Sequence, residues 1–118
     1  MTRLPDWPAR LAALLSAAET RRFDRHHWNC ARFALAAVEA CTGERPRVRV
    51  LPCLEASADS AGFPRIPPAF AGAGDVAIGG GEEPRLGVVV GCGRVAFVGP
   101  RGLVREPITD CRVAWRIG

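Results

Sequence analysis

The pattern of apolar and polar positions predicts two helices in the first third of the chain. Between residues 6 and 22, four apolar residues recur at helical spacing and form one stripe: Leu11, Leu14, Leu15 and Ala18. Asp6 can cap this helix, and Pro8 lies in its first turn, where a missing N–H is tolerated. The segment 21–28 is polar and aromatic and interrupts the helical pattern.

The second predicted helix begins after Asn29, which is a good N-cap residue, and ends before Gly43, which suits a left-handed C-cap. Six of its residues share one face: Cys30, Phe33, Ala34, Ala37, Val38 and Cys41. Arg32 and Glu39 fall on the opposite side. We therefore expect this helix to bury one apolar face against the core.

The last third of the chain has the short apolar runs and Gly- or Pro-containing turns of an antiparallel sheet. Strands are predicted over residues 75–78, 86–90, 94–98, 103–106 and 112–117. The run 86–90 is apolar on both faces, which is typical of a central strand. Trp115 alternates with Val113 and Ile117, so we expect it to pack inward.

The middle of the chain, residues 44–74, has a weaker pattern. Residues 48–51 alternate and predict a short strand. Residues 57–74 are rich in Gly and Pro, which opposes regular structure over much of this stretch. We expect a long connection that lies against the core through Phe63, Ile66 and Phe70.

Together these elements predict a single α+β domain over residues 1–118, with two helices followed by a small antiparallel sheet. The apolar runs are too short to span a bilayer, so no membrane partner is expected. The first ten residues lack the continuous apolar run of a signal peptide. We therefore expect a protein that is made and kept in the cytoplasm.

Charge and cysteine content narrow the classes of partner. The formal net charge is +4, and all 16 basic residues are arginines that are scattered along the chain, so a nucleic-acid partner is not favoured over a solvated basic surface. Glu82 and Glu83, in a turn predicted over 79–84, are expected to face solvent. The five cysteines show no C-x-x-C spacing, so neither a metal nor another cofactor is predicted, and we expect free, mostly buried thiols.

Cys30 is the candidate for covalent chemistry. A thiol in the first turn of a helix lies near unsatisfied N–H groups and the positive end of the dipole, which favour the reactive thiolate. A nucleophile also needs a base, and the only histidines, His26 and His27, lie three and four residues before it. A loop could fold one of them back onto the sulfur. The alternative is a packed structural thiol, exposed loop histidines, and Trp28 anchoring the loop on the core.

The order of motifs resembles a small phage and prophage family related to the NlpC-type cell-wall peptidases. The matching pieces are residues 23–46, with a helix that starts Cys-x-x-Phe and ends Thr-Gly, and residues 67–118, with a Gly-Asp before an apolar LGVVVG strand, a hairpin and CRVAWRIG. The resemblance implies a papain-like fold in which the cysteine-bearing helix packs on an antiparallel sheet. It also implies a cysteine nucleophile, a histidine base opening a strand, and a polar residue on the next strand that orients the histidine.

Carried onto this chain, the resemblance makes Cys30 the nucleophile and Phe33 the packing aromatic. Asn29 stands where Asp is usual, and Trp28 stands where the phage branch often has His. Gly74-Asp75 matches the Gly-Asp that precedes the first strand.

The other two catalytic roles are empty in this comparison. Arg85 or Leu86 occupies the place of the base, and an arginine cannot act as a general base at neutral pH. The strand RVAFV, residues 94–98, offers no polar residue at its centre.

The resemblance leads to two candidate functions. The first is a catalytically inactive NlpC-like domain that acts in tail assembly by binding other phage tail proteins, in the cytoplasm or on the virion tail. The second is an active cysteine peptidase or amidase that cleaves peptidoglycan stem peptides, with Cys30 as nucleophile and His26 or His27 as a rearranged base.

Overall fold

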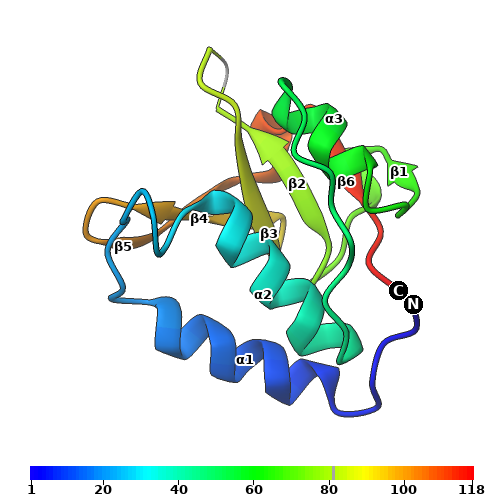
Figure 1. Ribbon diagram of the computed structural model, residues 1–118. Coiled ribbons are helices and arrows are strands. Elements are labelled where there is room, and N and C mark those ends of the chain that lie inside the picture. Colours follow the sequence, from blue (N-terminus) through cyan, green and yellow to red (C-terminus); the bar gives the residue numbers. More distant parts are fainter. Residues whose placement is uncertain (81) are drawn as a thin grey trace.

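The computed structural model, which describes residues 1–80 and 82–118, is an α+β fold in which helices cover one face of an antiparallel sheet (Figure 1). The helices are α1 (Trp7–Ala18), α2 (Cys30–Thr42) and α3 (Leu54–Asp59), with short 3-10 turns η1 (Pro68–Phe70) and η2 (Ile108–Asp110). The strands are β1 (Arg65–Ile66), β2 (Val76–Gly79), β3 (Arg85–Gly91), β4 (Arg94–Gly99), β5 (Gly102–Pro107) and β6 (Val113–Trp115). They form one sheet in the order β1-β6-β2-β3-β4-β5.

The caps predicted for α2 are confirmed. The side chain of Asn29 accepts a hydrogen bond from the Arg32 N–H at 3.0 Å, which satisfies one of the free donors of the first turn. At the other end, Gly43 adopts φ +77°, the left-handed conformation that costs glycine least. The helix therefore begins and ends at the residues that the capping signals in the sequence predicted.

The first helix is shorter than predicted. It begins after Asp6, whose side chain makes no capping hydrogen bond, and it ends at Ala18 rather than near residue 22. The chain then turns so that Arg21 stacks over the ring of Trp28 at 4.2 Å. This tertiary contact takes Arg21 out of the helix that the local pattern extended.

The two faces of the sheet are packed differently. On the helix face, α2 lies across the centre of the sheet, and α1 packs against α2 (Figure 1). Residues at alternate positions face these helices, such as Val88 and Ala96, which pair across β3 and β4. The opposite face carries Val89, Phe97 and their neighbours and is covered by connecting segments rather than by a helix.

The close packing of that opposite face depends on Gly87. A Cβ on Gly87 would lie 2.7 Å from the Phe97 ring and 2.7 Å from the Ala96 carbonyl oxygen. The absence of a side chain there lets the Phe97 ring lie directly against β3.

Several expectations for the middle of the chain are wrong. Residues 48–51 form no strand, and Phe70 is exposed instead of packing on the core. The expected long connection includes α3 and the two-residue strand β1, which pairs with β6. Phe63 and Ile66 do pack against the core, as expected.

The strands predicted in the last third are confirmed, with shifts of at most two residues at their ends. Trp115 is buried, as its alternation predicted, and Glu82 and Glu83 are exposed. Gly81, in the turn predicted over 79–84, lies outside the described residues.

Candidate functional site

Cys30 occupies the first position of α2, directly after the Asn29 cap. Its side chain is half-buried and packs against an apolar cluster that includes Ala34, Leu86 and Trp115. Among the described residues, no hydrogen bond involves its sulfur. The helix end therefore presents a thiol whose neighbours are apolar.

The two histidines lie on the exposed surface of the loop before α2. A ring nitrogen of His27 lies 3.3 Å from an Asp24 carboxylate oxygen, and the His26 N–H donates to the same oxygen at 3.0 Å. The His26 N–H and the His27 ring lower the pKa of Asp24. Within the described chain, no hydrogen bond joins either ring to Cys30, and the loop instead directs the His27 ring and the His26 backbone N–H to Asp24.

Trp28 anchors this loop. Its ring is buried and packs on Phe33 with ring centroids 5.7 Å apart, and the loop closes through an Asp24–Trp28 bridge. The indole N–H is buried without a hydrogen-bond partner among the described residues. The phage branch of the family that this chain resembles often has a histidine at this position. In this chain the position thus holds a tryptophan that packs on the core.

The sheet carries aliphatic side chains at the positions where a base that activates the Cys30 thiol, and the residue that orients this base, would be needed. Leu86 opens the helix face of β3 and is buried in the cluster against which Cys30 packs. Val88 of β3 pairs with Ala96 of β4, and the strands are antiparallel, so two residues further along each strand Leu86 lies opposite Val98. Val98 is also buried and apolar. Both roles that the resemblance assigns to polar side chains are filled by aliphatic ones.

Arg85, the other residue considered at the base position, faces the opposite side of the sheet. Its guanidinium lies over the Phe97 ring at 4.4 Å and pairs with Glu106 on β5. Successive residues of a strand point to opposite faces, so Arg85 cannot approach Cys30.

Asp75 has a structural role that accounts for the Gly-Asp motif. Its carboxylate is buried, pairs with Arg3 at 2.9 Å and accepts the Ile117 N–H at 2.9 Å. The Arg3 side chain also donates to the Ile117 and Ala73 carbonyl oxygens at 2.7 Å each. This network joins Arg3 and Ile117, close to the two ends of the chain, which lie beside each other in Figure 1.

The five thiols are free, and only two of them are buried, fewer than expected. Burial raises the pKa of Cys41 and of Cys111 and so keeps these two thiols protonated. Cys53 and Cys92 are exposed.

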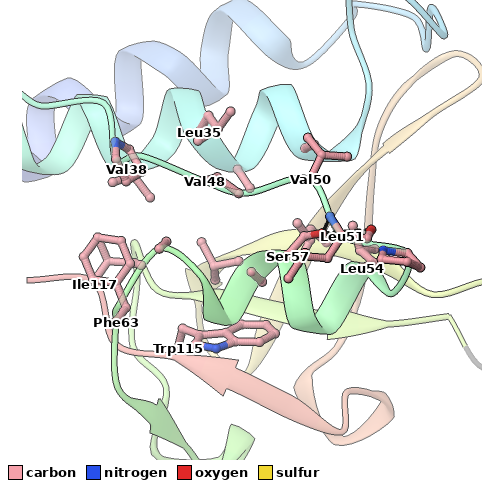
Figure 2. Close-up of a pocket in the computed structure, with 18 residues that line it drawn as sticks. Leu35, Val38, Val48, Val50, Leu51, Leu54, Ser57, Phe63, Trp115 and Ile117 are labelled. Carbon is pink, nitrogen blue, oxygen red and sulfur yellow. Dashed lines mark hydrogen bonds between the residues drawn. The ribbon is translucent and has the colours of Figure 1, made fainter.

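A cavity of about 430 Å³ opens beside α2, on the side away from α1. We call it the apolar groove. Its walls are α2, α3, the segment 46–52, which we call the arm, and the sheet below (Figure 2). Its lining residues are almost all apolar, with Ser57 as the exception, and include Leu35, Val38, Val48, Val50, Phe63 and Trp115. Among the described residues, the groove therefore has the lining of a recognition site without a titratable group.

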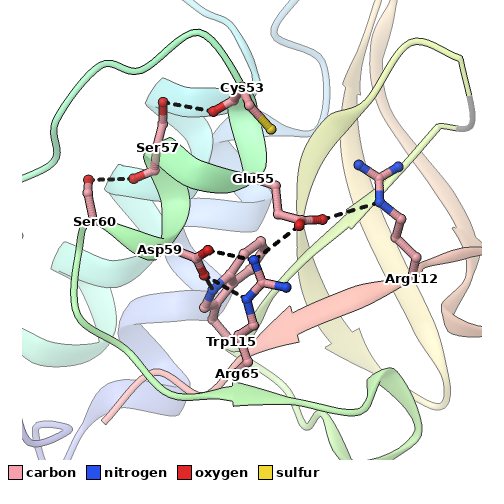
Figure 3. Close-up of polar contacts among 8 residues, drawn as sticks. All are labelled: Cys53, Glu55, Ser57, Asp59, Ser60, Arg65, Arg112 and Trp115. Atoms are coloured by element: carbon pink, nitrogen blue, oxygen red, sulfur yellow. Dashed lines mark hydrogen bonds and ion pairs between the residues drawn. The ribbon is translucent and has the colours of Figure 1, made fainter.

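A charged network holds α3, one wall of the groove, on the sheet (Figure 3). Arg65 of β1 donates to Asp59 at 2.8 Å and to Glu55 at 3.0 Å, and the Trp115 indole N–H donates to Asp59 at 2.9 Å. Arg112 donates to Glu55 at 3.3 Å. The hydrogen bonds from Arg65 and then Trp115 lower the pKa of Asp59 from 3.8 to about 2. The same residues thus orient Trp115, which forms the floor of the groove.

In the described ranges 1–80 and 82–118, no group of three or more His, Cys, Asp or Glu residues could hold a metal ion. None of the helices described combines the length and apolar character needed to cross a bilayer.

The fold and site define an α+β domain in which an apolar helix, opened by a cysteine, lies on an antiparallel sheet. A family model described as a domain of unknown function, DUF6950, matches residues 2–52 and 53–117. The chain therefore belongs to the DUF6950 family. No curated protein matches the chain.

Sequence reasoning missed the apolar groove. The signal that could have revealed it is the alternation Arg47-Val48-Arg49-Val50, of which residues 48–51 are predicted only as a short strand. This alternation separates an apolar side from a charged side, but it does not say that the partner is a helix.

Proposed function

We propose that this protein is a catalytically inactive, NlpC-like domain with a papain-type arrangement, which acts by binding other proteins in the assembly of a phage or prophage tail. The order of motifs along the chain supports the kinship. The placement of Cys30 at the start of a helix that lies on an antiparallel sheet is compatible with it.

The observation that carries the proposal is the apolar surrounding of Cys30. Leu86 and Val98 stand where a base and its orienting group would be needed. His26 and His27 are exposed, and among the described residues no hydrogen bond joins them to the sulfur. General-base activation of a thiol requires a group within hydrogen-bond reach, directly or through one water. The apolar groove, whose described lining holds no titratable group, favours recognition over catalysis.

The test of inactivity is cleavage of purified peptidoglycan stem peptides, followed by mass spectrometry. We expect no cleavage above a protein-free blank, and the same result for Cys30→Ala. Cleavage by the wild type that Cys30→Ala abolishes would overturn the proposal in favour of an active cysteine peptidase or amidase.

The test of the assembly role is co-purification with the products of neighbouring genes. We expect a stable complex with a tail protein, unchanged by Cys30→Ala. Neighbours that encode no tail component, or tail proteins that fail to bind, would contradict this role.

A further inference from the structure

In the described part of the chain, the arm is hydrogen-bonded along one edge. The N–H groups of Arg49 and Leu51 donate to the hydroxyls of Ser60, the C-cap of α3, and of Ser57 within α3, at 2.8 Å each. The Ser57 hydroxyl also donates to the Leu51 carbonyl oxygen at 3.2 Å. Bonding at every second residue is the pattern of an extended strand, in which alternate backbone groups point to opposite edges. Ser57 of α3 and its C-cap Ser60 thus take the place of a neighbouring strand.

The opposite edge of the arm is unpaired. In the described part of the chain, no hydrogen bond engages the N–H or C=O of Val48 or Val50. Val48 is 37% exposed and Val50 is 96% exposed. Figure 2 shows the arm running between α2 and α3, so this free edge borders the apolar groove. An unpaired strand edge is a template for a further strand.

The side chains of the arm divide by chemistry. Val48 and Val50 line the groove, whereas Arg47 and Arg49 are exposed and form no ion pair with any described residue. Neighbouring strands place their side chains on shared faces. A strand added to this edge would set one series of side chains into the groove and the other beside the two arginines.

We propose that the apolar groove binds an extended peptide of a partner protein, which adds as a strand to the free edge of the arm and carries alternating apolar and acidic side chains. Backbone pairing with Val48 and Val50 supplies the affinity, and the groove and the two arginines supply the specificity. This inference rests on the proposed binding role and specifies which kind of peptide the partner protein would present. A small apolar ligand would fill the cavity but would leave both the backbone edge and the arginines unused.

The experiment uses an eight-residue peptide of alternating valine and glutamate, acetylated and amidated at its ends, with the full-length protein. Amide NMR spectra are recorded during titration. We expect the Val48 and Val50 amides to shift with saturation and to exchange more slowly with solvent. A peptide of alternating valine and lysine should bind about tenfold more weakly, because its ammonium groups repel the two arginines that the glutamates attract.

Variants of the arm separate the two contributions. The double variant Arg47→Glu, Arg49→Glu should lose about tenfold in affinity for the Val–Glu peptide and gain affinity for the Val–Lys peptide. Arg101→Glu, at an exposed turn at the far edge of the sheet, is the matched charge control and should change affinity less than about twofold. Val50→Pro removes a donor from the free edge while keeping the Arg49 and Leu51 bonds, and it should also weaken binding.

The inference is overturned if the Val–Glu peptide leaves the Val48 and Val50 amides unshifted at millimolar concentration. It is also overturned if decanoate fills the groove while neither peptide binds, which would indicate a small-molecule site. Cysteine-dependent cleavage of stem peptides would overturn the inactive-domain proposal but would not affect these titrations. The two failures are therefore distinguishable.

Discussion

The two sides of α2 illustrate how one helix can serve packing and recognition at once. Toward the sheet, Phe33, Ala37 and Cys41 are completely buried. Toward the apolar groove, Ala31 is exposed and Leu35 is half-buried, although the surface is just as apolar. The sheet fills the first side, whereas the arm and α3 leave the second side open.

This difference bears on function because the open side of the helix is apolar up to the group capable of covalent chemistry. Cys30 is absent from the groove lining but packs against a cluster whose members Leu86 and Trp115 also line the groove. The groove, which a partner can reach, has Ser57 as the polar residue of its described lining. Among the described residues, the thiol thus has no hydrogen-bond partner, and the groove lining holds no titratable group.

The largest expected effect comes from the packed side of α2. Phe33→Ala should lower the free energy of unfolding by about 3–5 kcal/mol, since it leaves a cavity where the ring was fully buried. Leu35→Ala, on the groove side, should cost about 1 kcal/mol or less. Urea denaturation of both variants measures the contrast, and equal losses would mean that the groove side is packed like the sheet side.

A smaller effect is expected when the arm is released from α3. The double variant Ser57→Ala, Ser60→Ala removes the hydroxyls that accept the Leu51 and Arg49 N–H groups, so we expect a loss of roughly 1–2 kcal/mol. Hydrogen exchange at these two amides should accelerate. Ser16→Ala, an exposed serine of α1, is the control and should leave both measurements unchanged.

Replacing the candidate nucleophile, Cys30, should change the stability of the fold only slightly. Cys30→Ala should lower the free energy of unfolding by about 1 kcal/mol or less, because the side chain is half-buried and the change removes a single heavy atom, the sulfur. In the wild type, iodoacetamide should modify Cys30 no faster than the exposed Cys53, as followed by mass spectrometry. Faster alkylation of Cys30 at neutral pH would reveal an activated thiolate and erase the contrast between the two sides of the helix.

The smallest expected effect is a pH dependence of the groove wall. The pKa of Asp59 is lowered from 3.8 to about 2, so its ionised form stabilises the fold above pH 3.8 and this contribution is lost as the pH falls toward 2. Both Asp59 and Arg65 are partly exposed, which limits the effect to below about 1 kcal/mol. The Trp115 indole N–H resonance should shift over this range in the wild type and not in Asp59→Asn. A shift that persists in Asp59→Asn would assign it to another carboxyl group.

Local signals in the sequence predicted much of the fold. The caps Asn29 and Gly43 act within one turn of their own helix, so α2 was located correctly. The alternating strands near the end pair with near neighbours in the chain, as Val88 does with Ala96, and were also found. Cys30 was placed at a helix start, but whether a base reaches it depends on contacts that no local pattern specifies.

The middle of the chain was predicted poorly for a related reason. The strand expected over 48–51 has the right alternation, yet its backbone bonds go to the hydroxyls of Ser57 and Ser60. Phe70 was expected to be buried because it is apolar, but its 3-10 turn leaves it exposed. Such outcomes depend on which segments meet in space.

By itself, the sequence determined an α+β domain with a capped apolar helix, a cysteine at its start and an antiparallel sheet, because caps, periodicity and turns act over a few residues. Only the tertiary structure decided that Cys30 packs against the apolar cluster that contains Leu86, and that the His27 ring and the His26 N–H meet Asp24. It alone also decided that the arm keeps a free edge beside an apolar groove, since that edge exists only where α3 pairs with one side of the arm and no described residue pairs with the other.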